Sequence, residues 1–147
     1  MIQRDEIDDI DGLDVTPRHV GLRVDDWLER LTALFDSIEA WAAANNWRAK
    51  RGPPISMLEP LMERYGLQPR DQPTLTLQPM NGGGVVSIQP RGLWVIGANG
   101  RVDVFSPRGA FVLIDVADQF QAPQWTLHHL GKGKGERFEP KLIADLA

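Results

Sequence analysis

The chain has 147 residues, of which 42% are hydrophobic and 24% charged, with a net charge of −4 and no cysteine. This length predicts one domain, and the lack of cysteine excludes disulfides, thiolate nucleophiles and cysteine metal sites. The acidic balance argues against non-specific nucleic-acid binding. No run of 18 apolar residues is present, and the acidic start does not resemble a signal peptide. We therefore expect a soluble, cytoplasmic protein with no membrane segment.

The negative charge is concentrated at the start of the chain. Residues 1–14 carry six acidic residues against one arginine, a net charge of −5, which leaves +1 for the remainder. We predict an acidic N-terminal arm over residues 1–20, followed by a single α+β domain over residues 21–147. The arm is either a solvated terminus or a segment that docks on a basic partner.

The clearest helix follows this arm. Apolar residues recur from Trp27 to Trp41 at the spacing of one buried stripe, which predicts a helix over about residues 26–46. Asp26 and Glu29 have the spacing of a capping box at its start. The apolar stripe is typical of a helix that packs on a core.

Two shorter helices are also predicted. Ser56 begins a second capping-box pattern, and Gly66 suits the end of a helix, so a helix is expected over about residues 56–65. Pro140 favours the first turn of a short C-terminal helix that runs through Leu146.

Strand-like segments separated by turn residues lie between these helices. Helices followed by a run of strands indicate an α+β fold with an antiparallel sheet. We predict a curved, mainly antiparallel meander of about six strands over residues 74–130, with both N-terminal helices packed on it.

Three turn signals predict the register of this meander. They lie at residues 89–92, 98–101 and 106–109. Asn-Gly is the strongest two-residue hairpin signal, and such a turn pairs Trp94 with Phe105. A three-residue loop after Ser106, with Gly109 in a left-handed conformation, pairs Phe105 with Phe111. Trp94, Phe105 and Phe111 would then form one cross-strand row.

This register predicts a sheet with two apolar faces. We interpret one face as the core side, with the residues Leu93, Val95, Val102, Val104, Val112, Ile114 and Val116. The other face carries the aromatic row, together with Ile96 and Leu113. A half-exposed sheet usually alternates between apolar and polar residues, so the second apolar face requires a cover.

Three alternatives would account for what packs against the aromatic row. The first is a protein partner, either a second copy or another protein that this chain binds as an inhibitor or immunity-type protein, with Trp94, Phe105, Phe111, Ile96 and Leu113 as anchors. The acidic arm would favour a cationic partner. The alternative is a small-molecule pocket or enzyme site between the long helix and the curved sheet. The third is the long helix itself, which would leave an ordinary core.

Several polar residues are candidates for such a pocket. Asp103 lies among apolar residues and could act as a general acid or base, although a cross-strand pair between Arg101 and Asp115 is the more ordinary expectation for this face. His128 and His129 are adjacent on a predicted strand, so their side chains point to opposite faces and do not readily share a metal ion.

The glycine-rich stretch at 131–137 is the last candidate. Lys132, Lys134 and Arg137 could form an anion-binding loop, or the stretch could be a flexible basic linker. It matches neither a P-loop nor a dinucleotide fingerprint. No catalytic motif is present, so we expect no catalytic residue, metal or cofactor, and we favour a binding protein over an enzyme. Nucleic-acid binding is not expected, because Asp103 and Asp115 would repel phosphate on the aromatic face.

Overall fold

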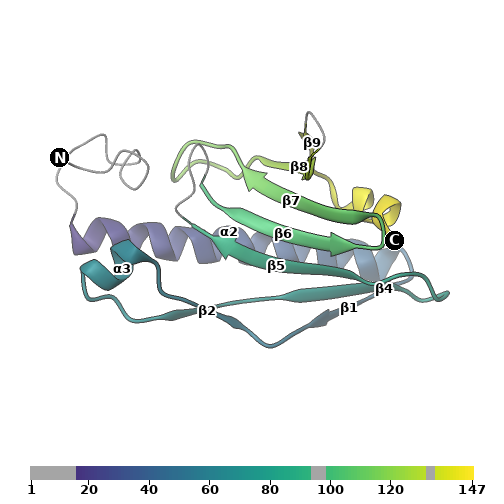
Figure 1. Cartoon of the computed structure of the whole chain (residues 1–147), viewed down its shortest axis with the longest axis horizontal. Coiled ribbons are helices and arrows are strands. Elements are labelled where there is room, and N and C mark those ends of the chain that lie inside the picture. Colours follow the sequence, from purple (N-terminus) through teal and green to yellow (C-terminus); the bar gives the residue numbers. More distant parts are fainter. Residues whose placement is uncertain (1–15, 94–98, 132–134) are drawn as a thin grey trace.

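The computed structural model describes residues 16–93, 99–131 and 135–147. A long helix, α2 (Pro17–Ala44), lies behind one face of an antiparallel sheet (Figure 1). The chain ends in a short 3-10 helix, η2 (Pro140–Leu146). The predicted α+β fold is therefore confirmed.

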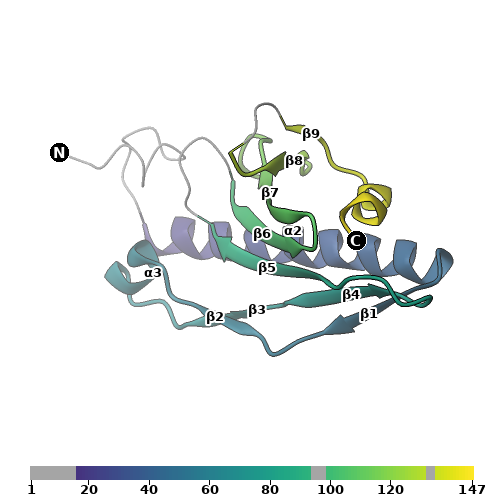
Figure 2. The same cartoon turned by 45° about the vertical axis from the view of Figure 1, so that its right-hand side comes forward.

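The main sheet has seven strands in the order β1-β4-β5-β6-β7-β8-β9, and each neighbouring pair is antiparallel. Its strands are β1 (Trp47–Arg51), β4 (Leu75–Pro79), β5 (Val86–Gly92), β6 (Arg101–Ser106), β7 (Gly109–Asp115), β8 (Trp125–His129) and β9 (Glu136–Arg137). Figure 2 shows the curvature of the sheet, with β7 at a steep angle to β1 and β4. A two-stranded sheet, β2 (Ile55–Met57) with β3 (Arg70–Gln72), is separate.

The sequence predicted that the long helix begins near Asp26, but α2 begins at Pro17. The side chain of Thr16 caps it by accepting a hydrogen bond from the backbone of His19 at 3.0 Å, and proline suits the first helical position. Asp26 lies inside the helix, where its carboxylate accepts a hydrogen bond from Arg30 at 2.7 Å.

The second helix is shorter than predicted. Ser56 belongs to strand β2, and only α3 (Pro60–Arg64) is helical. Glu59, the predicted partner of Ser56, accepts a hydrogen bond from the backbone N–H of Leu93 at 2.8 Å. Gly66 follows the helix with a φ of 71°, so its predicted role at the helix end is confirmed.

Strand β1 was not predicted. Asn46, with a φ of 60°, reverses the chain after α2, and Trp47 then pairs with Pro79 on β4. Trp47 and Ala49 alternate with exposed basic residues and pack against the core cluster. This strand was missed from the sequence because only two of its five residues are apolar, and its basic residues are also typical of the last turn of a helix.

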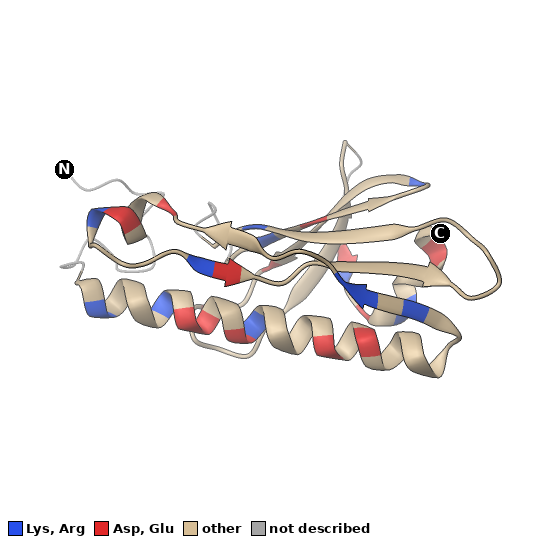
Figure 3. Cartoon of the chain, turned by 90° about the horizontal axis from the view of Figure 1, so that it is seen from below, with Lys and Arg blue, Asp and Glu red and all other residues tan. Residues whose placement is uncertain are grey.

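The space between α2 and the sheet is filled by core side chains. The helix contributes Trp27, Leu31, Phe35 and Ile38, all fully buried. The predicted helix stripe is therefore core, and its residues occupy the place where a pocket between helix and sheet was considered. Figure 3 shows the helix and the strands as two layers seen from below.

The predicted turn at residues 89–92 does not form. Strand β5 continues through this segment to Gly92 and pairs directly with β6, so Ile88 lies opposite Val104 and not opposite Trp94. The register shifts between Pro90 and Gly92, and such an irregularity accommodates a proline that cannot donate a hydrogen bond. Trp94 and Ile96 lie outside the described residues.

The hairpin between β6 and β7 has a two-residue loop. Ser106 pairs with Gly109, whose φ is 122°, and not with Ala110 as predicted. A shift of one residue moves every side chain of a strand to the opposite face. Phe105 therefore lies opposite Ala110, while Phe111 lies opposite Val104. Phe105 and Phe111 are on different faces, and the predicted row joining them is wrong.

Candidate functional site

The face of the sheet opposite α2 is the candidate site, and we call it the outer face. Helices α2, α3 and η2 all contribute side chains to the core on the other side of the sheet. The pairing registers align the outer-face residues in three rows across the strands. The rows are Thr76–Ser87–Phe105–Ala110, Gln89–Asp103–Val112–His128 and Arg101–Ile114–Thr126–Arg137.

Apolar residues cluster over strands β6 to β8 of this face. Phe105 is 46% exposed, and Leu130, whose backbone N–H donates to the carbonyl of Ala110 at 3.1 Å, is 49% exposed. Val112, which is only 4% exposed, and the half-buried Ile114 follow along β7 on the same face, so their predicted place on the core face is wrong. We call Phe105, Ala110, Val112, Ile114 and Leu130 the outer apolar patch.

The structure separates the predicted partner-binding residues. Phe105 lies on the outer face, whereas Leu113 is fully buried in the core. Phe111 is half-buried on the core side, where its ring stacks on His129 with centroids 4.3 Å apart. Of the predicted anchors in the described part of the chain, Phe105 alone belongs to the outer apolar patch.

The predicted cross-strand pair between Arg101 and Asp115 is wrong. Arg101 binds Asp103 at 2.9 Å on its own strand, and this pair lies on the outer face. The side chain of Asp103 is 13% exposed and that of Arg101 is 38% exposed. Asp103 thus lies between Gln89 and Val112 with its charge balanced.

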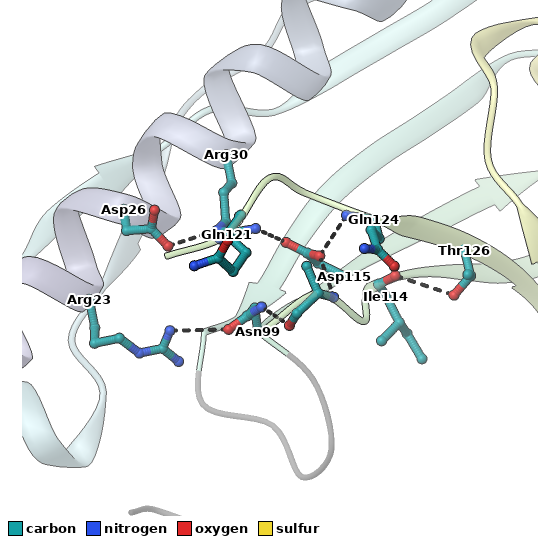
Figure 4. Close-up of polar contacts among 10 residues, drawn as sticks. Arg23, Asp26, Arg30, Asn99, Ile114, Asp115, Gln121, Gln124 and Thr126 are labelled. Atoms are coloured by element: carbon teal, nitrogen blue, oxygen red, sulfur yellow. Dashed lines mark hydrogen bonds and ion pairs between the residues drawn. The ribbon is translucent and has the colours of Figure 1, made fainter. Parts of the chain in front are cut away.

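Asp115 is completely buried on the core side and binds Arg30 of α2 (Figure 4). One carboxylate oxygen accepts a hydrogen bond from Arg30 Nη1 at 2.5 Å. The other accepts from the backbone N–H groups of Ala117 at 3.1 Å and Gln124 at 2.9 Å. The carboxylate therefore ties the helix to both ends of the connection between β7 and β8.

Arg30 is enclosed by acceptors. Its guanidinium also binds the Asp26 carboxylate and the carbonyl of Gln121. Burial by itself would lower the pKa of Arg30, but the hydrogen bond to Asp26 and the negative charge of Asp115 outweigh it and raise the pKa above its usual value. Arg30 therefore stays protonated and has a structural role. A guanidinium that does not lose its proton is unsuited to proton transfer.

Asn99 extends the same network to the loop before β6. Its side-chain oxygen accepts a hydrogen bond from Arg23 at 3.2 Å, and its amide donates to the carbonyl of Ala117. Its backbone N–H donates to the carbonyl of Asp115 at 2.8 Å. The network thus positions two loops on α2 (Figure 4).

The two histidines lie on opposite faces, as predicted. His128 is on the outer face, with its Nε2 atom 2.8 Å from the hydroxyl oxygen of Thr126. His129 stacks on Phe111 on the other side. No group of three or more residues able to hold a metal ion occurs in the described residues.

Arg137 ends strand β9 and lines a cleft together with the start of β8. Lys132 and Lys134, its predicted partners in an anion-binding loop, lie outside the described residues. The side chain of Arg137 makes no hydrogen bond or ion pair with the other described residues.

Two features of the site were missed from the sequence. Arg30 follows Asp26 by four residues, the spacing of a helical ion pair, which was the available signal for the buried network. Leu130 follows the predicted strand, and no local pattern showed that it lies beside Ala110.

Comparisons with protein-family models, with curated proteins and with solved structures find no match. Among the described residues, no helix is both long enough and apolar enough to span a membrane.

Proposed function

We propose that this protein is a protein–protein interaction module that docks through the outer apolar patch. The observation that carries this proposal is the exposure of Phe105, at 46%, beside Ala110 and the 49% exposed Leu130. Aromatic side chains with apolar neighbours are typical energetic centres of interfaces. A sheet face in a monomer usually carries polar residues at such positions.

The surroundings of the patch also have the composition of an interface. The Arg101–Asp103 pair and His128 border it with polar groups. An apolar centre with a polar rim is the usual arrangement of a protein interface. The arm at residues 1–14, with its net charge of −5, favours a partner that carries a cationic region next to its apolar contact.

A variant with Phe105→Asp tests the proposal. We expect it to keep the circular dichroism spectrum of the wild type, because the side chain is half exposed, and to lose a partner that the wild type retains. Light scattering detects a second copy as that partner, and affinity purification from the native host with mass spectrometry detects another protein.

Met80→Asp is the matched control, because Met80 is 61% exposed and follows β4, which is two strands away from β6. It adds the same charge outside the patch and should bind as the wild type does. Equal binding by Phe105→Asp and the wild type would show that the patch is not the docking surface. Unfolding of Phe105→Asp would show that the residue is core.

A further inference from the structure

A second surface feature borders the outer apolar patch on the side of strands β8 and β9. A cleft of about 470 Å³ lies where the connection after β7 meets the beginning of β8 and the end of β9. It is lined by Val116, Pro123, Gln124, Trp125, Thr126, Arg137 and Phe138. This volume is within the range of small-molecule sites.

The walls of the cleft are held by backbone hydrogen bonds. The N–H of Val116 donates to the carbonyl of Gln124 at 3.0 Å, and the N–H of Phe138 donates to the carbonyl of Trp125 at 2.9 Å. The N–H of Gln124 donates to the buried carboxylate of Asp115, which is fixed by Arg30. The cleft is therefore preorganised by the network that joins this connection to α2 (Figure 4).

Most of the lining is apolar. Val116 is 47% exposed and Pro123 is exposed, while Phe138 is half-buried and Trp125 is almost buried. The polar residues of the lining are Gln124, Thr126 and Arg137. An apolar wall with a few polar groups is the usual composition of a ligand site.

Arg137 gives the cleft a positive charge. It is the charged member of the described lining residues, and no described carboxylate pairs with it. Glu136 precedes it on β9 and lies opposite Leu127, so its side chain belongs to the other face of the strand. Glu139 is 3.6 Å from Lys141. A guanidinium presents two parallel N–H donors that match a carboxylate.

We propose that this cleft binds a small organic carboxylate with an aromatic or branched apolar body. The carboxylate binds Arg137, and the apolar body packs on Val116, Pro123 and the edge of Phe138. The cleft adjoins the outer apolar patch, because Thr126 in its wall pairs with Ile114 of the patch, but its ligand would bind without the partner proposed for that patch. Free acids and the C-terminus of a peptide share this chemistry.

Titration with 3-phenylpropionate, followed by amide chemical shifts in nuclear magnetic resonance, tests the site. We expect saturable shifts centred on Thr126 and Phe138, and at least about tenfold weaker binding of 3-phenylpropanamide, because the amide lacks the charge that strengthens the hydrogen bonds to arginine. A tetrapeptide that ends in phenylalanine distinguishes the two sources, since tighter binding of the peptide assigns the site to a C-terminus.

Arg137→Gln should weaken binding of 3-phenylpropionate by at least about tenfold. Val116→Glu, another exposed position, should weaken it by adding a negative charge at the wall. Arg108→Gln removes an exposed arginine in the β6–β7 turn and should bind as the wild type does. Absence of saturable shifts, equal binding of acid and amide, or unchanged binding by Arg137→Gln would each overturn the proposal.

Discussion

Gly100 lies against the ring of Trp27, a fully buried aromatic residue of α2. A Cβ atom at this position would approach Trp27 Cζ3 to 2.1 Å, and the φ of Gly100 is 154°. The sequence predicted this glycine as part of an Asn-Gly hairpin turn. The strand predicted before this turn lies outside the described residues, and in the described part Asn99 is buried and the backbone of Gly100 is packed against an indole ring.

Gly100→Ala tests this close approach. We expect it to lower the free energy of unfolding by about 2 kcal/mol more than Gly82→Ala, because overpacking a core costs about 1–3 kcal/mol. Gly82 is a suitable control, since its φ is also positive, at 87°, but a Cβ atom added there would meet no other atom within 4 Å. Urea denaturation measures both values, and equal losses would contradict a steric role for Gly100.

At the scale of elements, one buried ion pair joins the helix to the sheet. Asp115 is at the end of β7 and Arg30 is in α2, and their side chains are 0% and 3% exposed. This pair fixes the position of the β7–β8 connection, which forms part of the proposed carboxylate cleft. The ion pair between Arg101 and Asp103, on the opposite face of the sheet, joins two residues of one strand and is more exposed.

Asp115→Asn should lower the free energy of unfolding by about 3–5 kcal/mol, because it leaves Arg30 buried with less compensating charge. The matched change Asp103→Asn should cost about 1 kcal/mol or less, since the side chain of its partner Arg101 is partly exposed. Chemical denaturation followed by circular dichroism compares them. A small loss from Asp115→Asn would indicate that Asp26 alone compensates Arg30.

At the scale of the whole molecule, charge is distributed unevenly between the two layers. Figure 3 shows both acidic and basic residues along the N-terminal part of α2, acidic residues alone along its C-terminal part, and basic residues on β1. Arg51 of β1 binds Glu39 of α2 at 2.7 Å and Asp36 at 3.2 Å. The hydrogen bond from Arg51 holds the pKa of Glu39 below its usual value, although partial burial acts in the opposite direction.

The global stability should therefore depend on the charge of Glu39 in acid. A lowered pKa adds stability above the unfolded pKa of about 4.3, and this stability is lost as the pH falls through the folded value. At pH 7 the free energy of unfolding of the wild type should be higher than that of Glu39→Gln by less than about 1 kcal/mol, because the Arg51–Glu39 pair is partly exposed. The difference should shrink between about pH 5 and pH 3 in denaturation curves. Glu63→Gln is the control, and a difference that persists in acid would contradict the assignment.

The sequence by itself determined the fold class, the buried stripe of the long helix and the glycine at the end of α3. These follow from periodicity and local turn chemistry, which act over a few residues. The register of the sheet depended on tertiary structure. The turn after Ser106 is compatible with loops of two or three residues, and the choice places Phe111 either beside Phe105 or in the core.

The polar partners also depended on the tertiary structure. Asp115 has an arginine opposite it in the predicted register, yet it binds Arg30, which is 85 positions away along the chain. A buried carboxylate needs a cation and N–H donors, and only the packing of α2 on the sheet brings them to this carboxylate. The same packing leaves Phe105 on the outer face and Arg137 at the cleft, because α2 covers one side of the sheet and not the other.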